Sequence, residues 1–113
     1  MTEPNPEWEV SVHEVKRMLD TREDLALVDV REVDEHGIAR IEGAQLVPLS
    51  VFASRLGDLE ARADERMVIL CHHGQRSLQA AVFLREQGFA DVKSMAGGID
   101  AWSRAIDPTV PRY

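Results

Sequence analysis

The stretch MVILCHHGQRS, residues 67–77, joins an apolar run to a polar loop and decides the fold. Its first five residues are apolar and of strand length, and the nearly continuous apolar run LALVDV at residues 25–30 has the same character. Runs that are apolar on both faces suit parallel strands that helices cover on each side. The two runs therefore predict two buried strands of a parallel sheet.

Helix and strand patterns alternate along the rest of the chain. Ser11 is a candidate N-cap with Glu14 as its capping-box partner, and the helix expected from about Ser77 should stop at Gly88. Further elements are predicted at 44–49 (AQLVPL, strand), 51–60 (VFASRLGDLE, helix), 91–95 (DVKSM, strand) and 99–105 (IDAWSRA, helix). This alternation predicts an α/β fold with a parallel sheet between helices. We expect one domain over residues 1–113, with extended tails at 1–7 and 107–113.

Composition excludes several kinds of partner. The chain holds 13 basic and 20 acidic residues, and its net charge of −7 repels phosphate backbones and anionic membranes. We therefore expect no nucleic-acid partner and no membrane partner. A single cysteine forms no internal disulfide, and the first residues lack the basic start and apolar stretch of a signal peptide. These features predict a soluble, cytoplasmic protein of a reducing compartment.

The single cysteine, Cys71, lies where its predicted strand ends. Ligands of open parallel α/β sheets bind at this edge. The short loop after Cys71 leads into a helix, and unpaired N–H groups at a helix start favour anions. Gly74 allows the loop to curl tightly because it has no Cβ. The loop is therefore interpreted as a cradle that favours thiolate over thiol.

Two other interpretations of Cys71 compete with this one. A lone cysteine at a strand end is usually an inert small hydrophobe, although the polar residues that follow suit an exposed loop better than a core. A metal site with His72 and His73 is the second alternative. Adjacent side chains converge poorly on one tetrahedral centre and the usual ligand spacings are missing, so we expect no metal.

Four stretches resemble one known family. CHHGQRS resembles the active-site loop of rhodanese-type sulfurtransferases, which has a cysteine, a glycine three residues on and often Arg-Ser at its close. The early helix, LVDVREVDEHGIARIEGAQLVPLS (27–50) and GFADVKSMAGGIDAW (88–102) resemble three further signatures in the family's order. The resemblance spans nearly the whole chain. It implies a rhodanese-like three-layer sandwich, with a central, mostly parallel sheet of about five strands and helices on both faces.

The resemblance implies transfer of sulfane sulfur without a cofactor. Cys71 would take the outer sulfur of thiosulfate or a related anionic donor as a persulfide. It would pass this sulfur to cyanide or to an external thiol or protein acceptor, because the chain has no second cysteine. The implied substrate loop comprises His72, His73, Gly74, Gln75, Arg76 and Ser77, and the amides of residues 72–76 are expected to line the cradle.

Supporting residues follow from the same resemblance. The Arg76 side chain either binds the donor or braces the loop. Asp29 and Arg31 end the other apolar strand, and we favour a structural clamp over a catalytic role for them. Gly97 and Gly98 are expected to form a tight turn before the last helix. Arg40 departs from the family pattern, which often has histidine there.

Two other functions compete with sulfur transfer. Cell-cycle-type dual-specificity phosphatases and some arsenate reductases resemble this fold, but their loop places five residues between cysteine and arginine. Only four residues separate Cys71 from Arg76. A tetrahedral phosphate needs a wider ring of amides than one terminal sulfur, so the count favours sulfur. The second rival is a non-enzymatic sulfur carrier or interaction module, and the presence of the cysteine counts against it.

Overall fold

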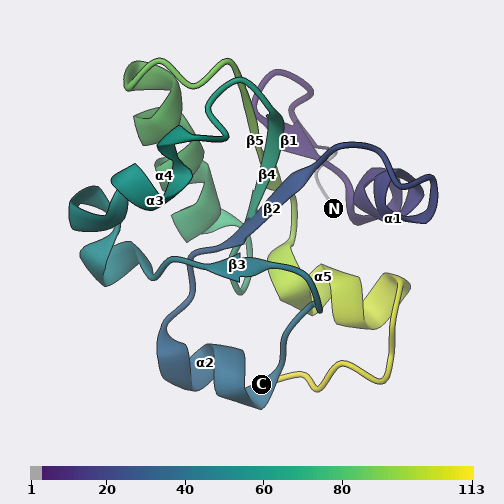
Figure 1. The fold of residues 1–113 in the computed structure, drawn as a ribbon. Coiled ribbons are helices and arrows are strands. Elements are labelled where there is room, and N and C mark those ends of the chain that lie inside the picture. The colour runs from purple at the N-terminus through teal and green to yellow at the C-terminus, as the bar shows by residue number, and fades with distance from the viewer. Residues whose placement is uncertain (1–3) are drawn as a thin grey trace.

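The computed structural model describes residues 4–113, which form a five-stranded sheet with helices on both faces (Figure 1). The strand order is β1-β5-β4-β2-β3, and all four pairings are parallel. The strands are β1 (Glu9–Val10), β2 (Ala26–Asp29), β3 (Gln45–Leu46), β4 (Arg66–Leu70) and β5 (Asp91–Met95). The predicted parallel sheet is confirmed, and the structure adds that the two apolar runs, β2 and β4, are adjacent strands.

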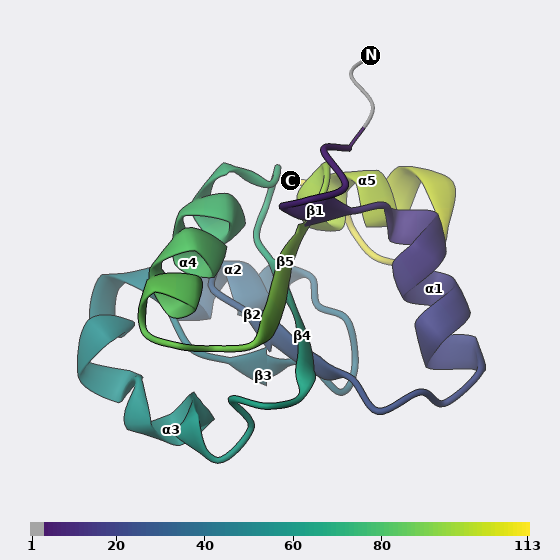
Figure 2. The same ribbon diagram turned by 90° about the horizontal axis from the view of Figure 1, so that it is seen from above.

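Helices complete a three-layer sandwich. Figure 2 shows α1 and α5 on one face of the sheet and α3 and α4 on the other. The helices are α1 (Val12–Asp20), α2 (Val33–Ile38), α3 (Gly57–Glu60), α4 (Gln75–Glu86) and α5 (Gly98–Ala105). The predicted sandwich is therefore confirmed. Within residues 4–113, every helix is too short or too polar to cross a membrane.

The central strands are buried on both faces, as their apolar sequences predict. Side chains alternate along β4: Met67 and Ile69 join the core under α3 and α4, whereas Val68 and Leu70 join the core under α1 and α5. None of the four is more than 1% exposed. Truncating such a side chain typically costs about 2–5 kcal/mol. A strand held this firmly fixes the position of the residue that follows it, Cys71.

The two longest helices begin close to where the sequence predicts. Ser11 Oγ accepts a hydrogen bond from the Glu14 amide at 3.1 Å, which caps α1. The reciprocal half of the capping box is replaced by an ion pair between the Glu14 carboxylate and Arg17. Helix α4 begins at residue 75, two residues before the expected start, and Gly88 follows its end with a φ of 96°.

Three elements differ from the predictions or were not predicted. Residues 51–60 do not form one helix: Leu49–Val51 and Ala53–Arg55 are 3₁₀ turns, and α3 is a single turn that starts at Gly57, a poor helix former. Strand β1 has two residues, and α2 buries none of its residues. Neither β1 nor α2 therefore carries a recognisable hydrophobic period.

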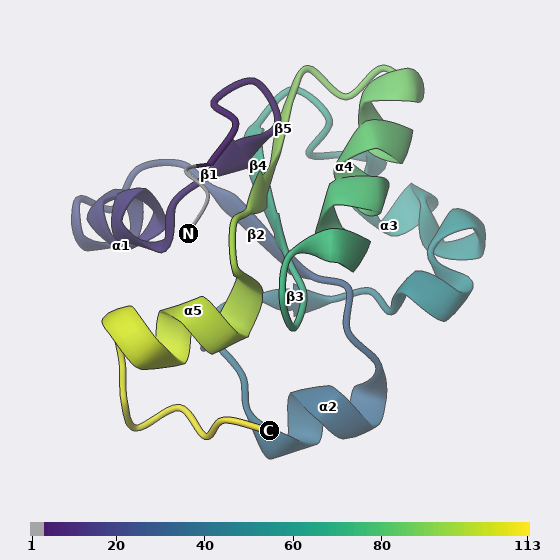
Figure 3. The same cartoon turned by 180° about the vertical axis from the view of Figure 1, so that it is seen from behind.

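The C-terminal segment, residues 107–113, has neither helix nor strand. It runs from the end of α5 back towards α2 (Figure 3). Val110 is buried in the core under α1 and α5, and the Tyr113 hydroxyl donates a hydrogen bond to Glu35 at 2.8 Å. The segment that the sequence suggests as a tail is therefore packed against the body of the domain. At the other end, the expected tail lies partly outside the described residues.

Candidate active site

Cys71 follows β4 directly and lies at the carboxyl edge of the sheet, the position predicted from the sequence. The residue is only 1% exposed. The chain then turns sharply into α4, and Gly74 has a φ of 104° at this turn. A Cβ at Gly74 would lie 3.2 Å from the Gly97 amide nitrogen. Both the backbone angle and the close approach require glycine here, as the loop sequence predicts.

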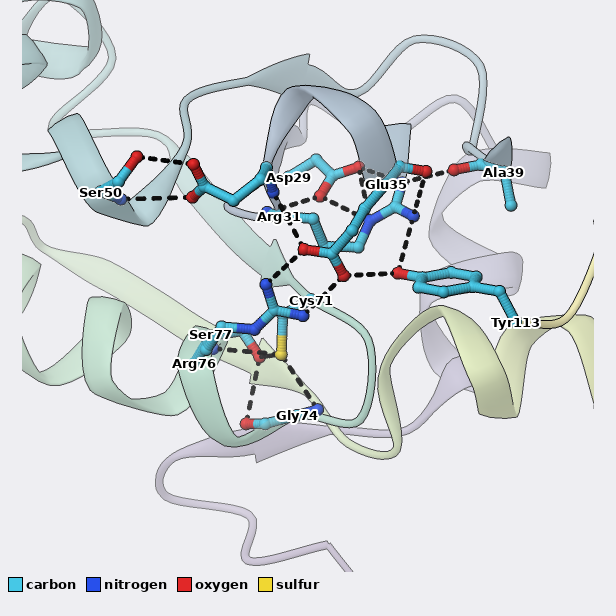
Figure 4. Close-up of polar contacts among 11 residues, drawn as sticks. Asp29, Arg31, Glu35, Ala39, Ser50, Cys71, Gly74, Arg76, Ser77 and Tyr113 are labelled. Carbon is cyan, nitrogen blue, oxygen red and sulfur yellow. Dashed lines mark hydrogen bonds and ion pairs between the residues drawn. The ribbon is translucent and has the colours of Figure 1, made fainter. Parts of the chain in front are cut away.

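The Cys71 sulfur receives hydrogen bonds from the turn that encloses it (Figure 4). The Gly74 amide lies 3.1 Å from Sγ and the Ser77 amide 3.3 Å from it. The Ser77 hydroxyl is also 3.3 Å from Sγ. In this contact the thiol donates to the hydroxyl oxygen. The two amide donors at the start of a helix favour negative charge on the sulfur.

The loop also contains amides with no acceptor in the described chain. Within residues 4–113, the amides of His72, His73, Gln75 and Arg76 donate no hydrogen bond. Of the five amides expected to line the cradle, only that of Gly74 contacts Sγ itself. The second amide that contacts Sγ is that of Ser77, which was not among the five. That the other four amides line the cradle stays a prediction.

Helix α5 holds the backbone of the same loop. The Ile99 amide donates to the Cys71 carbonyl at 2.8 Å, and the Asp100 amide donates to the His72 carbonyl at 3.1 Å. A Cβ at Gly98 would lie 2.4 Å from the His72 carbonyl oxygen. Gly98 therefore does more than form the expected turn, because its missing side chain lets α5 approach the cysteine loop.

The Arg76 guanidinium is held by Glu35 from α2. Its Nη1 and Nη2 atoms lie 2.6 and 2.9 Å from the two carboxylate oxygens. The bonds to Arg76 lower the pKa of Glu35 to about 2, against the opposing effect of burial. Figure 4 shows this pair beside the cysteine. The contacts are those of a brace, the second of the two roles that the sequence leaves open for Arg76.

Asp29 and Arg31 form a fully buried ion pair, with Arg31 Nη2 2.7 Å from Asp29 Oδ2. Arg31 also donates to the Ala39 carbonyl at 2.6 Å and to the Glu35 carbonyl at 3.2 Å. Among the described residues neither side chain contacts the Cys71 sulfur. Arg31 reaches the loop through Glu35, which holds Arg76, and through Tyr113, which stacks on His72. This arrangement supports the predicted clamp.

Tyr113 and two histidines form a stack of rings along the loop. The His72 ring lies 3.9 Å from the Tyr113 ring at an interplanar angle of 8°, and 3.9 Å from the His73 ring at 30°. Burial, followed by the nearby His73, lowers the pKa of His72. The Tyr113 hydroxyl also accepts a hydrogen bond from Arg31 at 3.1 Å.

Sequence reasoning missed Glu35 and Tyr113. Glu35 is one of two acidic residues in a helix that buries none of its residues, and Tyr113 lies 78 residues away from it along the chain. No local pattern connects the two.

Arg40 is exposed and pairs with Glu42, away from the sulfur contacts described above. No group of three or more metal-ligating side chains occurs among residues 4–113.

Comparisons with known proteins agree with this geometry. A family model described as rhodanese-like domain matches residues 11–105. The chain is 34% identical over 103 residues to "Thiosulfate sulfurtransferase GlpE" of Pseudoalteromonas translucida, a match that covers 91% of this chain and 95% of GlpE. A solved structure of a rhodanese-like domain protein from Staphylococcus aureus superimposes with a TM-score of 0.79 at 25% identity. That match covers 94% of this chain and 98% of the other.

A longer relative matches as well. The chain is 37% identical over 109 residues to "Adenylyltransferase and sulfurtransferase MOCS3-2" of Zea mays, and the match covers 92% of this chain. The chain spans only about a quarter of the length of this and several other curated relatives. The family-model match at residues 11–105 extends well beyond the cysteine loop and includes β2, β4, β5 and α5. The chain therefore belongs to the rhodanese-like domain family, a family that includes sulfurtransferases.

Proposed function

We propose that this domain is a sulfurtransferase that carries sulfane sulfur as a Cys71 persulfide. The observation that carries the proposal is the set of donors around one sulfur. The Gly74 and Ser77 amides donate to Sγ, and four neighbouring amides have no acceptor among residues 4–113. This arrangement provides donors for a thiolate at Sγ and for a second, terminal sulfur bound to it.

The reaction occurs in two displacements at sulfur. With thiosulfate, the Cys71 thiolate attacks the outer sulfur, the bond between the two donor sulfurs breaks, and sulfite leaves with its electron pair. The terminal sulfur of the resulting persulfide is then attacked by cyanide, a thiolate or a protein acceptor. The electron pair of the broken S–S bond returns to Cys71, which is regenerated as thiolate. No external oxidant or reductant is consumed.

The acceptor comes from outside the domain. Cys71 is the only cysteine in the sequence, so the chain cannot resolve its own persulfide as an internal disulfide. The curated relative GlpE is named a thiosulfate sulfurtransferase, and this name supports thiosulfate as a donor. The chain spans 23% of the maize relative, so that protein's acceptor is not carried over to this domain.

Phosphate chemistry fits the loop less well. Four residues lie between Cys71 and Arg76. In addition, both terminal nitrogens of Arg76 bond Glu35 rather than point freely over the sulfur. A phosphatase of this fold needs that cation for the phosphate oxygens. A non-enzymatic carrier would load sulfur on Cys71 in the same way but release it slowly.

The test measures thiocyanate release from thiosulfate and cyanide, beside an aryl-phosphatase assay on the same protein. We expect thiocyanate but no phosphatase activity. Thiosulfate-treated protein should gain the mass of one sulfur atom, and cyanide should reverse the gain. The matched control is Cys71→Ala, which removes only the sulfur from a small side chain. Thiocyanate production by the folded control at the wild-type rate would refute the proposal, and loading without turnover would favour the carrier.

A further inference from the structure

Two buried serine hydroxyls lie beneath the cysteine. Ser77 comes from the first turn of α4 and Ser94 from β5, and both are 0% exposed. Their Oγ atoms are 2.7 Å apart. Ser77 Oγ is also 3.3 Å from Cys71 Sγ. Within residues 4–113, Ser94 makes no hydrogen bond to the sulfur. The hydroxyls therefore form a chain that ends at the nucleophile.

Both hydroxyls also reach one backbone carbonyl. The Gly74 oxygen lies 3.1 Å from Ser77 Oγ and 3.3 Å from Ser94 Oγ. It accepts a further hydrogen bond from the Leu78 amide at 3.2 Å. This carbonyl therefore stays hydrogen-bonded whichever way the two hydroxyls turn, so turning them leaves no buried acceptor unpaired.

Each hydroxyl has only one hydrogen to donate, which limits the possible arrangements. When the sulfur is a thiol, its S–H donates to Ser77 Oγ, and the Ser77 hydrogen turns to Gly74 or Ser94. When the thiol has lost its proton to solvent, the sulfur becomes an acceptor, and the Ser77 hydrogen turns towards it. The second arrangement is favoured if Ser94 donates to Ser77, because the Ser77 hydrogen cannot then point at Ser94.

We propose that Ser94 is a positioning residue of this site, which orients the Ser77 hydroxyl so that it donates to the negatively charged Cys71 sulfur. The inference deepens the proposed function and rests on it for its role in catalysis. Thiolate is consumed when Cys71 attacks the donor and is regenerated when sulfur leaves. A hydrogen bond to an ionised group is roughly twice as strong as one between neutral groups. The oriented hydroxyl therefore raises the fraction of Cys71 that is thiolate before the first displacement and stabilises the thiolate that leaves in the second.

The test is a double-mutant cycle with Ser77→Ala, Ser94→Ala and the double variant. The readout is the pH at which iodoacetamide alkylation of Cys71 reaches half its maximal rate. We expect Ser77→Ala to raise this midpoint by about one pH unit and Ser94→Ala by about half as much. Because Ser94 acts only through Ser77, Ser94→Ala should have no further effect once Ser77 is alanine.

Two variants serve as controls. Ser94→Thr keeps a hydroxyl and should retain the wild-type midpoint. Ser103→Ala removes another buried serine hydroxyl, which donates to the Val110 carbonyl, and should leave the midpoint unchanged. Thermal unfolding identifies any variant that fails to fold. If Ser94→Ala does not fold, Ser94→Gly, which also removes the hydroxyl, takes its place in the cycle. The Ser77→Ala and Ser94→Thr variants are then measured as before.

The outcomes separate this inference from the proposed function. The positioning role would be overturned if Ser94→Ala shifted the alkylation midpoint equally in the wild-type and Ser77→Ala proteins. It would also be overturned if a folded Ser94→Ala variant showed no shift. Alkylation requires only the thiolate and no sulfur donor. If no donor loads the wild-type protein while the cycle behaves as expected, the proposed function fails and the hydroxyl arrangement stands.

Discussion

Glu35 and Arg76 form a two-pronged ion pair that ties α2 to the cysteine loop, with nitrogen to oxygen distances of 2.6 and 2.9 Å. Glu35 extends this link in two directions. Its carboxylate accepts from the Tyr113 hydroxyl, and its carbonyl accepts from the buried Arg31. The cysteine loop, the C-terminal segment and the buried Arg31 therefore meet at one residue, Glu35.

The Glu35 pair predicts a specific pH dependence of stability. The pKa of Glu35 is about 2 in the folded protein, below its usual value near 4.5. A lowered pKa contributes stability that is fully present above the usual value and is lost as pH falls towards 2. Glu35→Gln should therefore destabilise the domain by roughly 1–3 kcal/mol at pH 7, and the difference should shrink between about pH 4.5 and 2.

Urea unfolding at a series of pH values measures this difference. Glu42→Gln is the matched control, because the Glu42 side chain is 86% exposed in its pair with Arg40 and should contribute little at any pH. If the difference in unfolding free energy between the wild type and Glu35→Gln stayed constant down to pH 3, the ion pair would not be the source of that difference.

Gly98→Ala should disrupt the cysteine loop. The new Cβ would lie 2.4 Å from the His72 carbonyl and 2.5 Å from the Cys71 carbonyl, at a φ of 63°. We expect a loss of more than about 3 kcal/mol in unfolding free energy, with little persulfide formed. Gly43→Ala is the control, since Gly43 has a φ of 89° but no atom within 4 Å of the added carbon. It should lose only about 1 kcal/mol, and similar losses in both variants would argue against close packing at Gly98.

Tyr113 should stabilise the loop through its ring and its hydroxyl separately. Tyr113→Phe keeps the ring on His72 but removes the contacts with Glu35 and Arg31. We expect it to cost about 1 kcal/mol, and Tyr113→Ala to cost more because the stack is also lost. Thermal unfolding and the proteolysis rate within residues 107–113 measure both effects. Equal behaviour of the two variants would show that the ring contributes nothing.

Loop length should control the chemistry. One glycine inserted between Gly74 and Gln75 would separate the two amides that contact Sγ. Persulfide formation should then fall by about tenfold or more, because removal of an aligned donor weakens anion stabilisation. Mass spectrometry after thiosulfate treatment measures the loss, and an aryl-phosphatase assay detects any new anion specificity. The control is a glycine inserted beside Gly43, and unimpaired loading in the loop variant would count against the idea.

The central strands and the nucleophile could be predicted from the sequence because their signals are local. An apolar run that ends in a cysteine, followed by a glycine-containing turn and helix formers, places Cys71 at the correct sheet edge. Helix α2 could not be predicted because it buries no residue, and Glu35 was missed with it. Tyr113 and Ser94 reach the site only through the tertiary fold, from positions far along the chain.

The anchoring of the cysteine loop by α5 and Tyr113 has a consequence for how the protein is made. Cys71 and α4 emerge from the ribosome before Ile99, Asp100 and Tyr113, whose contacts fasten the loop. Closing contacts between distant parts of the chain slows folding, because the entropy of loop closure is lost before the contacts form. A nascent chain that has reached α4 therefore carries a thiol whose anion-stabilising turn is not yet secured. The turn around Cys71 is complete only once α5 and the segment after it have docked on the sheet.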